Sequence, residues 1–596
     1  MNITEDIHRQ FAEYFDEKAI WPYAYLLSQR LTEGNICISM EDMPEHLKST
    51  PYKEPPVPTK DLLKMSQLVT NNGSNSTPFV LHNDRLYFQR YFKYETSIIE
   101  KLKSLIAAEQ SVLRERMQQL ESKSALIKTL ITDYSLEGLM PKEKVDWQLV
   151  AVLQSLLNNF SIITGGPGTG KTTTLAKLLI VLYELDPNAT VALAAPTGKA
   201  SMRMADSLKA STLKFTAATK AKIENLKPST IHSLLGYKKE SVNFKHNAQK
   251  PLPYNWVVVD EASMIDVPMF SKLLEALGDN CRIILLGDKD QLASVEAGSL
   301  LGDLCQTLPS LNMFDNEKAN WINTFIEDAE RKINTEFIGD QKQLMSGHII
   351  ELKFSHRFNS QGTIGKVSKA VIEGRFEETK QLIQNAVDNS VIIDNEYTPE
   401  LLETFVEGYS KYINEPDVKE ALKKINELRV LVAVRQGPRG LHATNKAIEL
   451  HLRKKRLLKP DGEMYENKPI MVTRNMHDLG LLNGDTGIMR KDSSNTLRVW
   501  FEDGQGGIKS ILPAYLNYTE TAFAMTIHKS QGSEFKNVMV VLPEGTSNAL
   551  LTRELLYTGI TRAKTSITIQ GEMDTIKHAI ESCVKRISGI TGRIDH

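Results

Sequence analysis

Residues 160–172 read FSIITGGPGTGKT, a short apolar run followed by a glycine-rich loop. The loop satisfies the pattern G-x-x-x-x-G-K-[ST] between a predicted strand and a predicted helix, which is the signature of a P-loop. A chain of this length is expected to contain the pattern by chance only roughly 0.02 times. Glycines let backbone N–H groups turn toward phosphate oxygens, whose charge the start of the following helix favours. The predicted ATP-binding residues here are Gly165, Gly166, Pro167, Gly168, Thr169, Gly170, Lys171, Thr172 and Thr173.

Acidic residues follow a second predicted strand and complete the site expected around this loop. The apolar run Trp256–Val259 ends in Asp260 and Glu261. We expect Lys171 to reach the β- and γ-phosphates of ATP, and Thr172 and Asp260 to hold Mg²⁺. Glu261 would polarise the attacking water. Because the sequence contains no recognisable phosphate-acceptor site and no convincing guanine-specific Asn-Lys-x-Asp motif, these residues predict Mg²⁺-dependent ATP hydrolysis.

Seven short apolar runs predict parallel strands covered by helices on both faces, because they are rich in β-branched residues and lack strict alternation. They fall into two groups, at about 160–290 and about 430–570, and so predict an α/β fold with two α/β domains in tandem. The predicted strands are Ser161–Ile163, Val191–Ala195, Trp256–Val259, Ile283–Leu286, Val430–Val434, Val538–Leu542 and Ser566–Ile569.

Smaller units are expected around these two domains. The N-terminal region predicts a helix over 7–31 and a hairpin formed by 78–81 and 85–88, and a long polar helix over 97–128 would join it to the rest. A Gly- and Asn-rich stretch with alternating short strands predicts a small β-barrel insertion. The expected division is an N-terminal α+β domain at 1–115, a first α/β domain at 116–345, and a second at 346–596 with the insertion at about 455–520.

Composition and charge exclude several classes of protein. The chain has 596 residues, 72 Lys and Arg against 73 Asp and Glu, and a net charge of −1. This balance excludes a polycation that binds an anionic partner through its total charge, so any nucleic-acid binding must come from locally sorted charge. The four cysteines lack CxxC spacing, and no apolar run approaches the roughly 18 residues of a membrane span. We expect a soluble, cytoplasmic protein that does not act at a membrane.

Further polar segments follow the predicted strands. Asp288 and Gln291 come directly after the run at 283–286 and would lie beside the γ-phosphate. Three other segments are FSHRF (354–358), AMTIHKSQG (524–532) and LYTGITRAK (556–564). This set, in this order, resembles the superfamily 1 helicases. The resemblance implies two tandem RecA-like P-loop motor domains and an adenine-reading glutamine at Gln148. It also matches Arg357 and Arg562 to two arginines that the second motor domain projects onto the γ-phosphate, where they would stabilise the charge of phosphoryl transfer.

Other segments narrow the resemblance to the RecD group. They are STIHSLLG (229–236), DEASMID (260–266), LGLLNGDTG (479–487) and DRLYFQRY (84–91). The resemblance implies an SH3-like insertion, an N-terminal docking domain, and 5′-3′ movement on single-stranded DNA. It further implies action at duplex DNA ends in double-strand break repair by homologous recombination, with RecB and RecC as partner subunits. The alternatives are a stand-alone RecD-like helicase, or a mainly regulatory interaction subunit with ATPase activity.

Single-stranded DNA is held by backbone amides, hydroxyls, cations and aromatic stacking. Loops that follow strands supply candidates of this kind, namely Thr197, Lys199, Thr230, His232, Thr526, His528 and Lys529. For any single hydroxyl, local capping of a helix is an equally good interpretation. The basic segment Tyr237–Lys250 is predicted to be a strand-separating pin, because RecD-like proteins carry a hairpin at this place. The resemblance assigns nuclease activity to RecB, and no intrinsic nuclease is expected.

Overall fold

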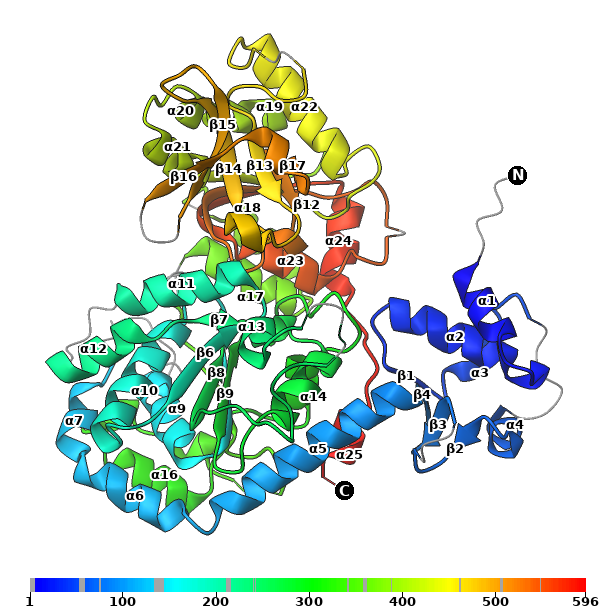
Figure 1. Ribbon diagram of the computed structural model, residues 1–596, viewed down its shortest axis with the longest axis vertical. Helices are drawn as coiled ribbons and strands as arrows, with labels where there is room; N and C mark the ends of the chain where they lie inside the picture. Colours follow the sequence, from blue (N-terminus) through cyan, green and yellow to red (C-terminus); the bar gives the residue numbers. More distant parts are fainter. Residues whose placement is uncertain are drawn as a thin grey trace.

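The computed structural model describes residues 6–52, 59–73, 77–132, 144–210, 216–238, 241, 243–339, 342–356, 362–386, 388–459, 462–503, 507–546 and 548–595. In Figure 1 the N-terminal domain (blue) lies beside the first α/β domain (cyan to green), and the second α/β domain lies above the first. Among the described residues, no helix has the length and apolar character needed to cross a membrane.

The N-terminal domain packs helices against a four-stranded sheet of order β1-β4-β3-β2. The predicted hairpin is confirmed, since β3 and β4 pair antiparallel around Asn83 and Asp84, which both have positive φ. The single helix predicted over 7–31 is wrong: two helices form, and the second begins beside Pro22, which fits only the first turn of a helix. The elements are α1 (Ile7–Glu13), α2 (Trp21–Thr32), β1 (Cys37–Ser39), α3 (Met43–Leu47), α4 (Thr59–Met65), β2 (Val69–Thr70), β3 (Phe79–His82) and β4 (Arg85–Phe88).

Three helices replace the long polar helix predicted over 97–128. They are α5 (Gln89–Glu109), α6 (Leu113–Ser122) and α7 (Ser124–Thr129). The chain breaks after α5, where the Ser111 hydroxyl donates a hydrogen bond back to the Ala108 carbonyl and so competes with continuation of the helix. Ile98, Leu102 and Leu105 bury one face of α5 in the core of the first α/β domain. This helix therefore joins the N-terminal domain rigidly to its neighbour.

The first α/β domain is built on six parallel strands of order β10-β5-β9-β8-β6-β7. The four strands predicted in this region are confirmed, and two short edge strands are added. The strands are β5 (Phe160–Thr164), β6 (Val191–Ala195), β7 (Ser229–Thr230), β8 (Trp256–Val259), β9 (Arg282–Gly287) and β10 (Ile349–Glu351). The helices are α9 (Trp147–Leu157), α10 (Lys171–Leu185), α11 (Gly198–Lys209), α12 (Ala217–Asn225), α13 (Ile231–Leu235), α14 (Val267–Glu275), α15 (Leu300–Gln306) and α16 (Asn316–Asn323).

The second α/β domain has five parallel strands of order β11-β20-β19-β12-β18. Its three predicted strands are confirmed as β12, β19 and β20. The strands are β11 (Val391–Asp394), β12 (Leu428–Val432), β18 (Ala524–Thr526), β19 (Phe535–Val541) and β20 (Ala563–Gln570). The helices are α17 (Thr363–Ile372), α18 (Phe376–Gln384), α19 (Pro399–Val406), α20 (Ser410–Ile413), α21 (Val418–Ile425), α22 (Leu441–Lys454), α23 (Arg553–Ile560) and α24 (Met573–Glu581).

An antiparallel sheet of order β16-β15-β14-β13-β17 lies within the predicted β insertion. Its strands are β13 (Pro469–Val472), β14 (Thr486–Lys491), β15 (Leu497–Glu502), β16 (Ile508–Ile511) and β17 (Thr519–Thr521). A small apolar core that includes Val472, Leu481 and Phe501 holds it together. The SH3-like identity of this sheet stays a prediction.

Both expected limits of the second α/β domain need correction. Strand β10 pairs with β5, with Ile349 opposite Ile162, so the first sheet continues beyond the predicted boundary at residue 346. At the other end, α25 (Ile590–Arg593) leaves the second domain, and Ile590 and Ile594 join the buried core of the first. Neither crossing has a sequence signal, because a three-residue strand and a four-residue helix are too short for periodicity to detect.

Candidate ATP-binding cleft

The glycine-rich loop forms the expected turn between β5 and α10. Gly168 and Gly170 have φ values of +77° and +87°, which side chains with a Cβ rarely adopt. Helix α10 begins at Lys171, whose Nζ donates to the carbonyls of Gly165 at 2.6 Å and Gly166 at 3.1 Å. Thr172 is half-buried at the first turn and Thr173 is exposed. The cradle, the cation and the helix N-terminus therefore meet at one point, which suits a triphosphate.

Gln148 supports the loop from behind. Its Nε2 donates to the Thr169 carbonyl at 3.2 Å, and its Oε1 accepts from the Thr132 hydroxyl at 3.2 Å. A Cβ on Gly170 would approach the Gln148 amide to 2.1 Å, so a glycine is needed there. In this structure Gln148 positions the P-loop, and its reading of adenine stays a prediction.

A buried cation beside Gln148 was missed by the sequence analysis. Lys177 on α10 is only 2% exposed and donates to the Thr132 hydroxyl, which also contacts the Asp146 carboxylate at 2.8 Å. Burial lowers the pKa of Lys177 to about 8. The available signal was a lysine within the otherwise apolar run 175–182 of α10.

The two predicted carboxylates follow β8 and face the cleft. The Glu261 N–H donates to Asp260 Oδ1 at 2.8 Å, and Glu261 adopts the left-handed conformation with φ +52°. Burial, and then the charge of Glu261, raise the pKa of Asp260 to about 6. A cation bound here would relieve that repulsion, so the pair fits the predicted Mg²⁺ site with Thr172.

Asp288 and Gln291 connect the first domain to the second. Asp288 Oδ2 accepts hydrogen bonds from Gln291 Nε2 at 2.9 Å and from the Tyr557 hydroxyl at 3.0 Å. The next residue, Leu292, donates its N–H to Thr558 Oγ1 and accepts from Gln531 Nε2 through its carbonyl. The segment after β9 is thus held by helix α23 of the other domain.

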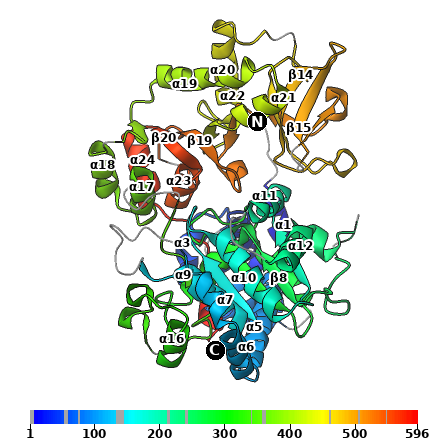
Figure 2. The same ribbon diagram turned by 90° about the vertical axis from the view of Figure 1, so that its left-hand side faces the viewer.

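A cleft of about 1100 Å³ separates the two domains and is lined by both. In Figure 2 the second domain lies above the first, with β14 and β15 over α11. The lining includes Gln148, Lys171, Thr172, Asp260, Glu261 and Gln291 from the first domain and Arg562 from the second. Arg562 is buried and donates to the Thr558 and Ser533 carbonyls at 3.0 and 3.3 Å. Arg357 lies outside the described residues.

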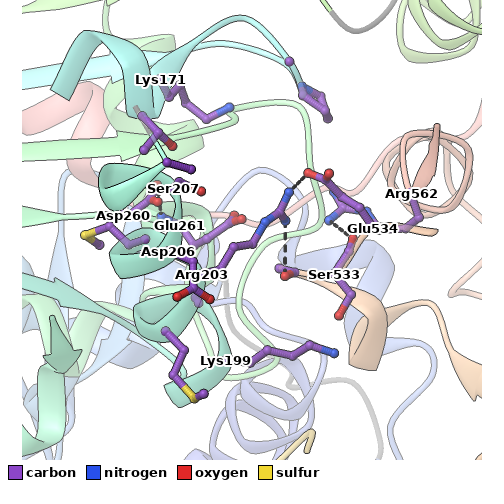
Figure 3. Close-up of a pocket in the computed structure, with 18 of the residues that line it drawn as sticks. Lys171, Lys199, Arg203, Asp206, Ser207, Asp260, Glu261, Ser533, Glu534 and Arg562 are labelled. Carbon is purple, nitrogen blue, oxygen red and sulfur yellow. Dashed lines mark hydrogen bonds and ion pairs between the residues drawn. The ribbon is translucent and has the colours of Figure 1, made fainter. Parts of the chain in front are cut away.

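Figure 3 shows Arg203 of α11 reaching across the cleft to the segment that carries Glu534, with Arg562 on the same far wall. Arg203 forms an ion pair with Glu534 and donates to the Gly532 carbonyl at 3.2 Å. Glu534 also pairs with Lys564 at 3.1 Å. The sequence analysis missed Arg203, although it lies four residues after Lys199 and hence on the same face of α11.

The predicted DNA-contact residues are divided between the two domains. Three hydroxyls cap local turns: Thr197 Oγ1 accepts from the Ala200 N–H, Thr230 Oγ1 from the Ser233 N–H, and Thr526 Oγ1 from the Lys529 N–H. These bonds leave hydroxyl lone pairs and protons for a ligand, so the interaction with DNA stays a prediction.

Lys199 and Lys529 meet beside one loop of the β insertion. Lys529 Nζ donates to Asn483 Oδ1 at 2.8 Å, and the Lys199 side chain lies 4.0 Å from the Cβ position of Gly484. His528 is half-buried, whereas His232 is exposed and has an edge contact with Phe244.

The described part of the predicted pin forms a compact turn. Lys245 and His246 donate their N–H groups to the carbonyls of Gly236 and Leu235, and Asn247 pairs with Lys250. Residues 239, 240 and 242 lie outside the described residues. Strand separation by this segment stays a prediction.

Comparisons with known proteins agree with this geometry. Residues 2–87 match the family described as "RecBCD enzyme subunit RecD, N-terminal domain", residues 148–297 an AAA domain, and residues 521–569 a UvrD-like helicase C-terminal domain. RecBCD enzyme subunit RecD of Haemophilus influenzae is 34% identical over 98% of this chain and 94% of its own. The chain belongs to the RecD family.

Two other relatives place the chain within the family. RecBCD enzyme subunit RecD of Mycolicibacterium smegmatis is 30% identical over 96% of this chain and 92% of its own. The ATP-dependent RecD2 DNA helicase of Deinococcus radiodurans is 26% identical over 74% of this chain and 52% of its own. The chain is therefore an ATP-dependent helicase of the RecD family with two RecA-like motor domains, and the fold, the family and the enzyme class predicted from the motifs are confirmed.

Proposed function

We propose that this chain is an ATP-dependent DNA helicase that moves 5′ to 3′ on single-stranded DNA as the RecD subunit of a RecBCD-type complex. The observation that carries the proposal is that one cleft gathers Lys171 and the Asp260–Glu261 pair from the first α/β domain and Arg562 from the second. A hydrolysis site completed only by two domains couples nucleotide state to the distance between them.

ATP would lie in the glycine-rich loop with its γ-phosphate toward Lys171 and Glu261. Glu261 accepts the proton of the attacking water, while Lys171 and Arg562 stabilise the charge on the transferring phosphoryl group. We propose that Arg357 adds a second arginine from the other domain. Thr172 and Asp260 would hold Mg²⁺, which supplies further charge neutralisation at the phosphates.

Gln291 would report the presence of the γ-phosphate to the second domain. Its amide shares Asp288 Oδ2 with the Tyr557 hydroxyl of α23, so a change at Gln291 reaches that helix through one carboxylate. Leu292 continues the connection through Thr558 and Gln531. Opening and closing of the cleft would then accompany each hydrolysis cycle.

DNA would bind across both domains through the loops that carry Thr197, Lys199 and Thr230 on one side and Thr526, His528 and Lys529 on the other, with His232 beside the first group. Lys199 and Lys529 approach the same loop of the β insertion, which supports a path between the insertion and α11. Because these cations would contact DNA phosphates and release counterions, affinity should fall as salt rises despite the neutral total charge.

The complex is proposed from the family. The chain is 34% identical to the Haemophilus influenzae RecD subunit but 26% identical to the Deinococcus radiodurans RecD2 helicase, and its residues 2–87 match the N-terminal domain of the RecBCD subunit, which favours the subunit over the stand-alone enzyme. RecB and RecC are the proposed partners, the N-terminal domain the docking unit, and duplex DNA ends in double-strand break repair by homologous recombination the place of action. We propose no intrinsic nuclease.

The deciding experiment compares unwinding of 5′-tailed, 3′-tailed and blunt duplexes with ATP, using the chain alone and with RecB and RecC. We expect the chain to unwind 5′-tailed duplexes, and Lys171→Gln to abolish this without loss of fold. Preference for a 3′ tail would contradict the proposal. Activity only with the partners would identify an obligate subunit.

The pin has its own test. Reversing the charges of Lys238, Lys245 and Lys250 should reduce unwinding while DNA-stimulated ATP hydrolysis persists. A matched variant reverses three exposed lysines on the second domain, Lys411, Lys419 and Lys423. Intact unwinding in the pin variant would show that the assignment is wrong.

A further inference from the structure

The last described residues, 583–595, form a segment that leaves the second α/β domain and returns to the other two; we refer to it as the C-terminal segment. It starts at the second domain, where the Val584 N–H donates to Glu554 Oε2 at 3.0 Å. In Figure 1 it runs down beside the first domain and ends with α25 next to α5. This segment therefore contacts the N-terminal domain and both α/β domains within 13 residues.

The C-terminal segment is anchored on helix α5. Glu95 is fully buried there, and its two carboxylate oxygens accept from the Gly589 N–H at 2.8 Å and from Arg593 Nη1 at 3.1 Å. Arg593 Nη2 also donates to Thr96 Oγ1. A buried carboxylate with these charged and neutral donors is a defined attachment point, because removing either donor leaves it under-satisfied.

The N-terminal domain holds the same segment from the other side. The Ile587 N–H donates to Asn35 Oδ1 at 3.0 Å, and the Ile587 carbonyl accepts from the Ile36 N–H at 3.2 Å. The paired contacts fix one residue of the segment against the start of β1.

Arg586 directly precedes Ile587 and reaches the loop that follows Gln291. Its Nη1 donates to the Gly298 carbonyl at 2.9 Å and to the Glu296 carbonyl at 3.1 Å. The Gly298 N–H donates to the Gly34 carbonyl at 2.9 Å, so the N-terminal domain contacts the same loop. Gly34 has φ +93°, and a Cβ there would lie 2.7 Å from Arg586 Nε.

We propose that Arg586 is a positioning residue for ATP hydrolysis: it fixes the loop 292–298, and with it Gln291, to the N-terminal domain through the C-terminal segment. Residues at both ends of the loop are held, since Leu292 is bonded to the second domain while Glu296 and Gly298 are bonded to Arg586. Gln291 precedes this loop directly and lies in the cleft. The N-terminal domain thus influences the geometry at the γ-phosphate without touching nucleotide.

Geometry distinguishes positioning from simple support of the fold. The two ends of the loop are buried at Leu292 and Ala297, whereas Val295 in its middle is 76% exposed, so apolar packing holds the ends and not the middle. The Glu296 and Gly298 carbonyls also accept from the Ser294 hydroxyl, at 2.9 and 3.2 Å, but that residue belongs to the loop itself. Arg586 supplies the charge-assisted hydrogen bonds that tie these carbonyls to the C-terminal segment. Arg586 also lies near His528, and burial followed by this positive charge lowers the pKa of that imidazole. The same arginine therefore bonds a loop of the first motor domain and acts electrostatically on a candidate DNA-contact residue of the second.

The test compares Arg586→Ala with Lys585→Ala, which removes a neighbouring exposed cation from the same segment. Two quantities are measured in the full chain: hydrogen–deuterium exchange of the amides in 292–298, and kcat and KM for ATP with saturating single-stranded DNA. We expect faster exchange and a kcat lower by about 10-fold, with KM changed less, in Arg586→Ala alone. Arg586→Lys should recover part of kcat, because one of the two carbonyls remains within reach of an ammonium.

Each other outcome would overturn the inference. Unchanged exchange with a lower kcat would mean that Arg586 acts elsewhere, and faster exchange with an unchanged kcat would mean that the loop does not control hydrolysis. If Arg586→Ala does not fold, Arg586→Met keeps the apolar stem without a donor, and unchanged exchange and kcat in that variant would overturn the inference. The inference rests on the proposed ATPase, and exchange measured without nucleotide distinguishes failure of the inference from failure of the proposed function. Absence of hydrolysis in the unchanged chain would contradict the function, whereas the attachment of the loop could still be tested by exchange.

Discussion

The two parallel sheets of this molecule are built alike but supply different halves of the chemistry. Both bury their strands between helices, and both present loops at the cleft. The glycine-rich loop and the Asp260–Glu261 pair lie on the first, whereas the second contributes Arg562 and the segment that contains Glu534. We therefore propose that the first α/β domain binds nucleotide and that efficient hydrolysis requires the second.

Removing Arg562 should have the largest effect on ATP hydrolysis. Arg562→Ala is expected to lower kcat for ATP by about 1000-fold, because an arginine supplied to the transferring phosphoryl group is typically worth that much, while KM changes by only a few fold. Steady-state hydrolysis with single-stranded DNA measures both. Since Arg562 is buried, thermal melting and the Arg562→Lys variant serve as controls for folding. A loss of kcat below about 10-fold would place the main charge stabilisation elsewhere.

Lys171→Gln should impair the part of the chemistry that the first α/β domain supplies. We expect a loss of roughly 100- to 1000-fold in kcat, because one preorganised cation at the developing charge is removed, and weaker nucleotide binding as well. Titration with a fluorescent ATP analogue measures the binding change that Arg562→Ala should lack. Lys209→Gln, at an exposed position of α11, is the matched control. If Lys171→Gln and Arg562→Ala weaken nucleotide binding equally, the proposed difference in role between the two α/β domains is wrong.

The ion pair between Arg203 and Glu534 tests how much the contact across the cleft contributes. The Arg203 side chain is 37% exposed, so we expect only an effect of up to about 5-fold in kcat/KM from Arg203→Gln or Glu534→Gln. The double variant should lose less than the sum of the two single variants, because the ion pair that the two side chains share is lost only once. Additive losses would mean that each residue acts separately.

Asp303 should have the smallest effect on hydrolysis, because it concerns stability and the attachment of the C-terminal segment. Burial raises the pKa of the Asp303 carboxyl to about 7, and the negative charge of Glu95 acts in the same direction. The hydrogen bond from Ser588 and the positive charge of Arg586 oppose this shift. A carboxyl group with a raised pKa contributes stability that is complete below its unfolded pKa and is lost as pH rises through its folded pKa.

Relative to Asp303→Asn, the unchanged chain should therefore lose at most about 1.4 kcal/mol of unfolding free energy per pH unit between about pH 4 and 7, and nothing further above that. Urea unfolding at several pH values measures the difference. Asp279→Asn, at an exposed acidic position, should show no such trend. A pH-independent difference for Asp303→Asn would show that the carboxyl keeps its ordinary pKa.

The sequence predicted most of what periodicity and spacing can encode. The seven short apolar runs became central strands, and the P-loop and Asp260–Glu261 were placed at one sheet edge because parallel strands end together. The edge strand β10 and helix α25 were missed because three or four residues carry no period. Arg203, Glu534 and Arg586 were missed as partners because their contacts join positions hundreds of residues apart, and only the folded chain specifies such pairs.

The left-handed conformation of Glu261 has a consequence for how this protein can change. A residue with a Cβ at φ +52° stores on the order of 1 kcal/mol that a glycine would not. Selection for heat resistance alone would therefore favour glycine at position 261, and would remove the side chain proposed to activate water. A relative that has lost ATP hydrolysis could accept that substitution, whereas one that uses this side chain to activate water must retain the strained carboxylate. If Glu261 activates water as proposed, its presence therefore indicates that ATP hydrolysis has been retained by selection.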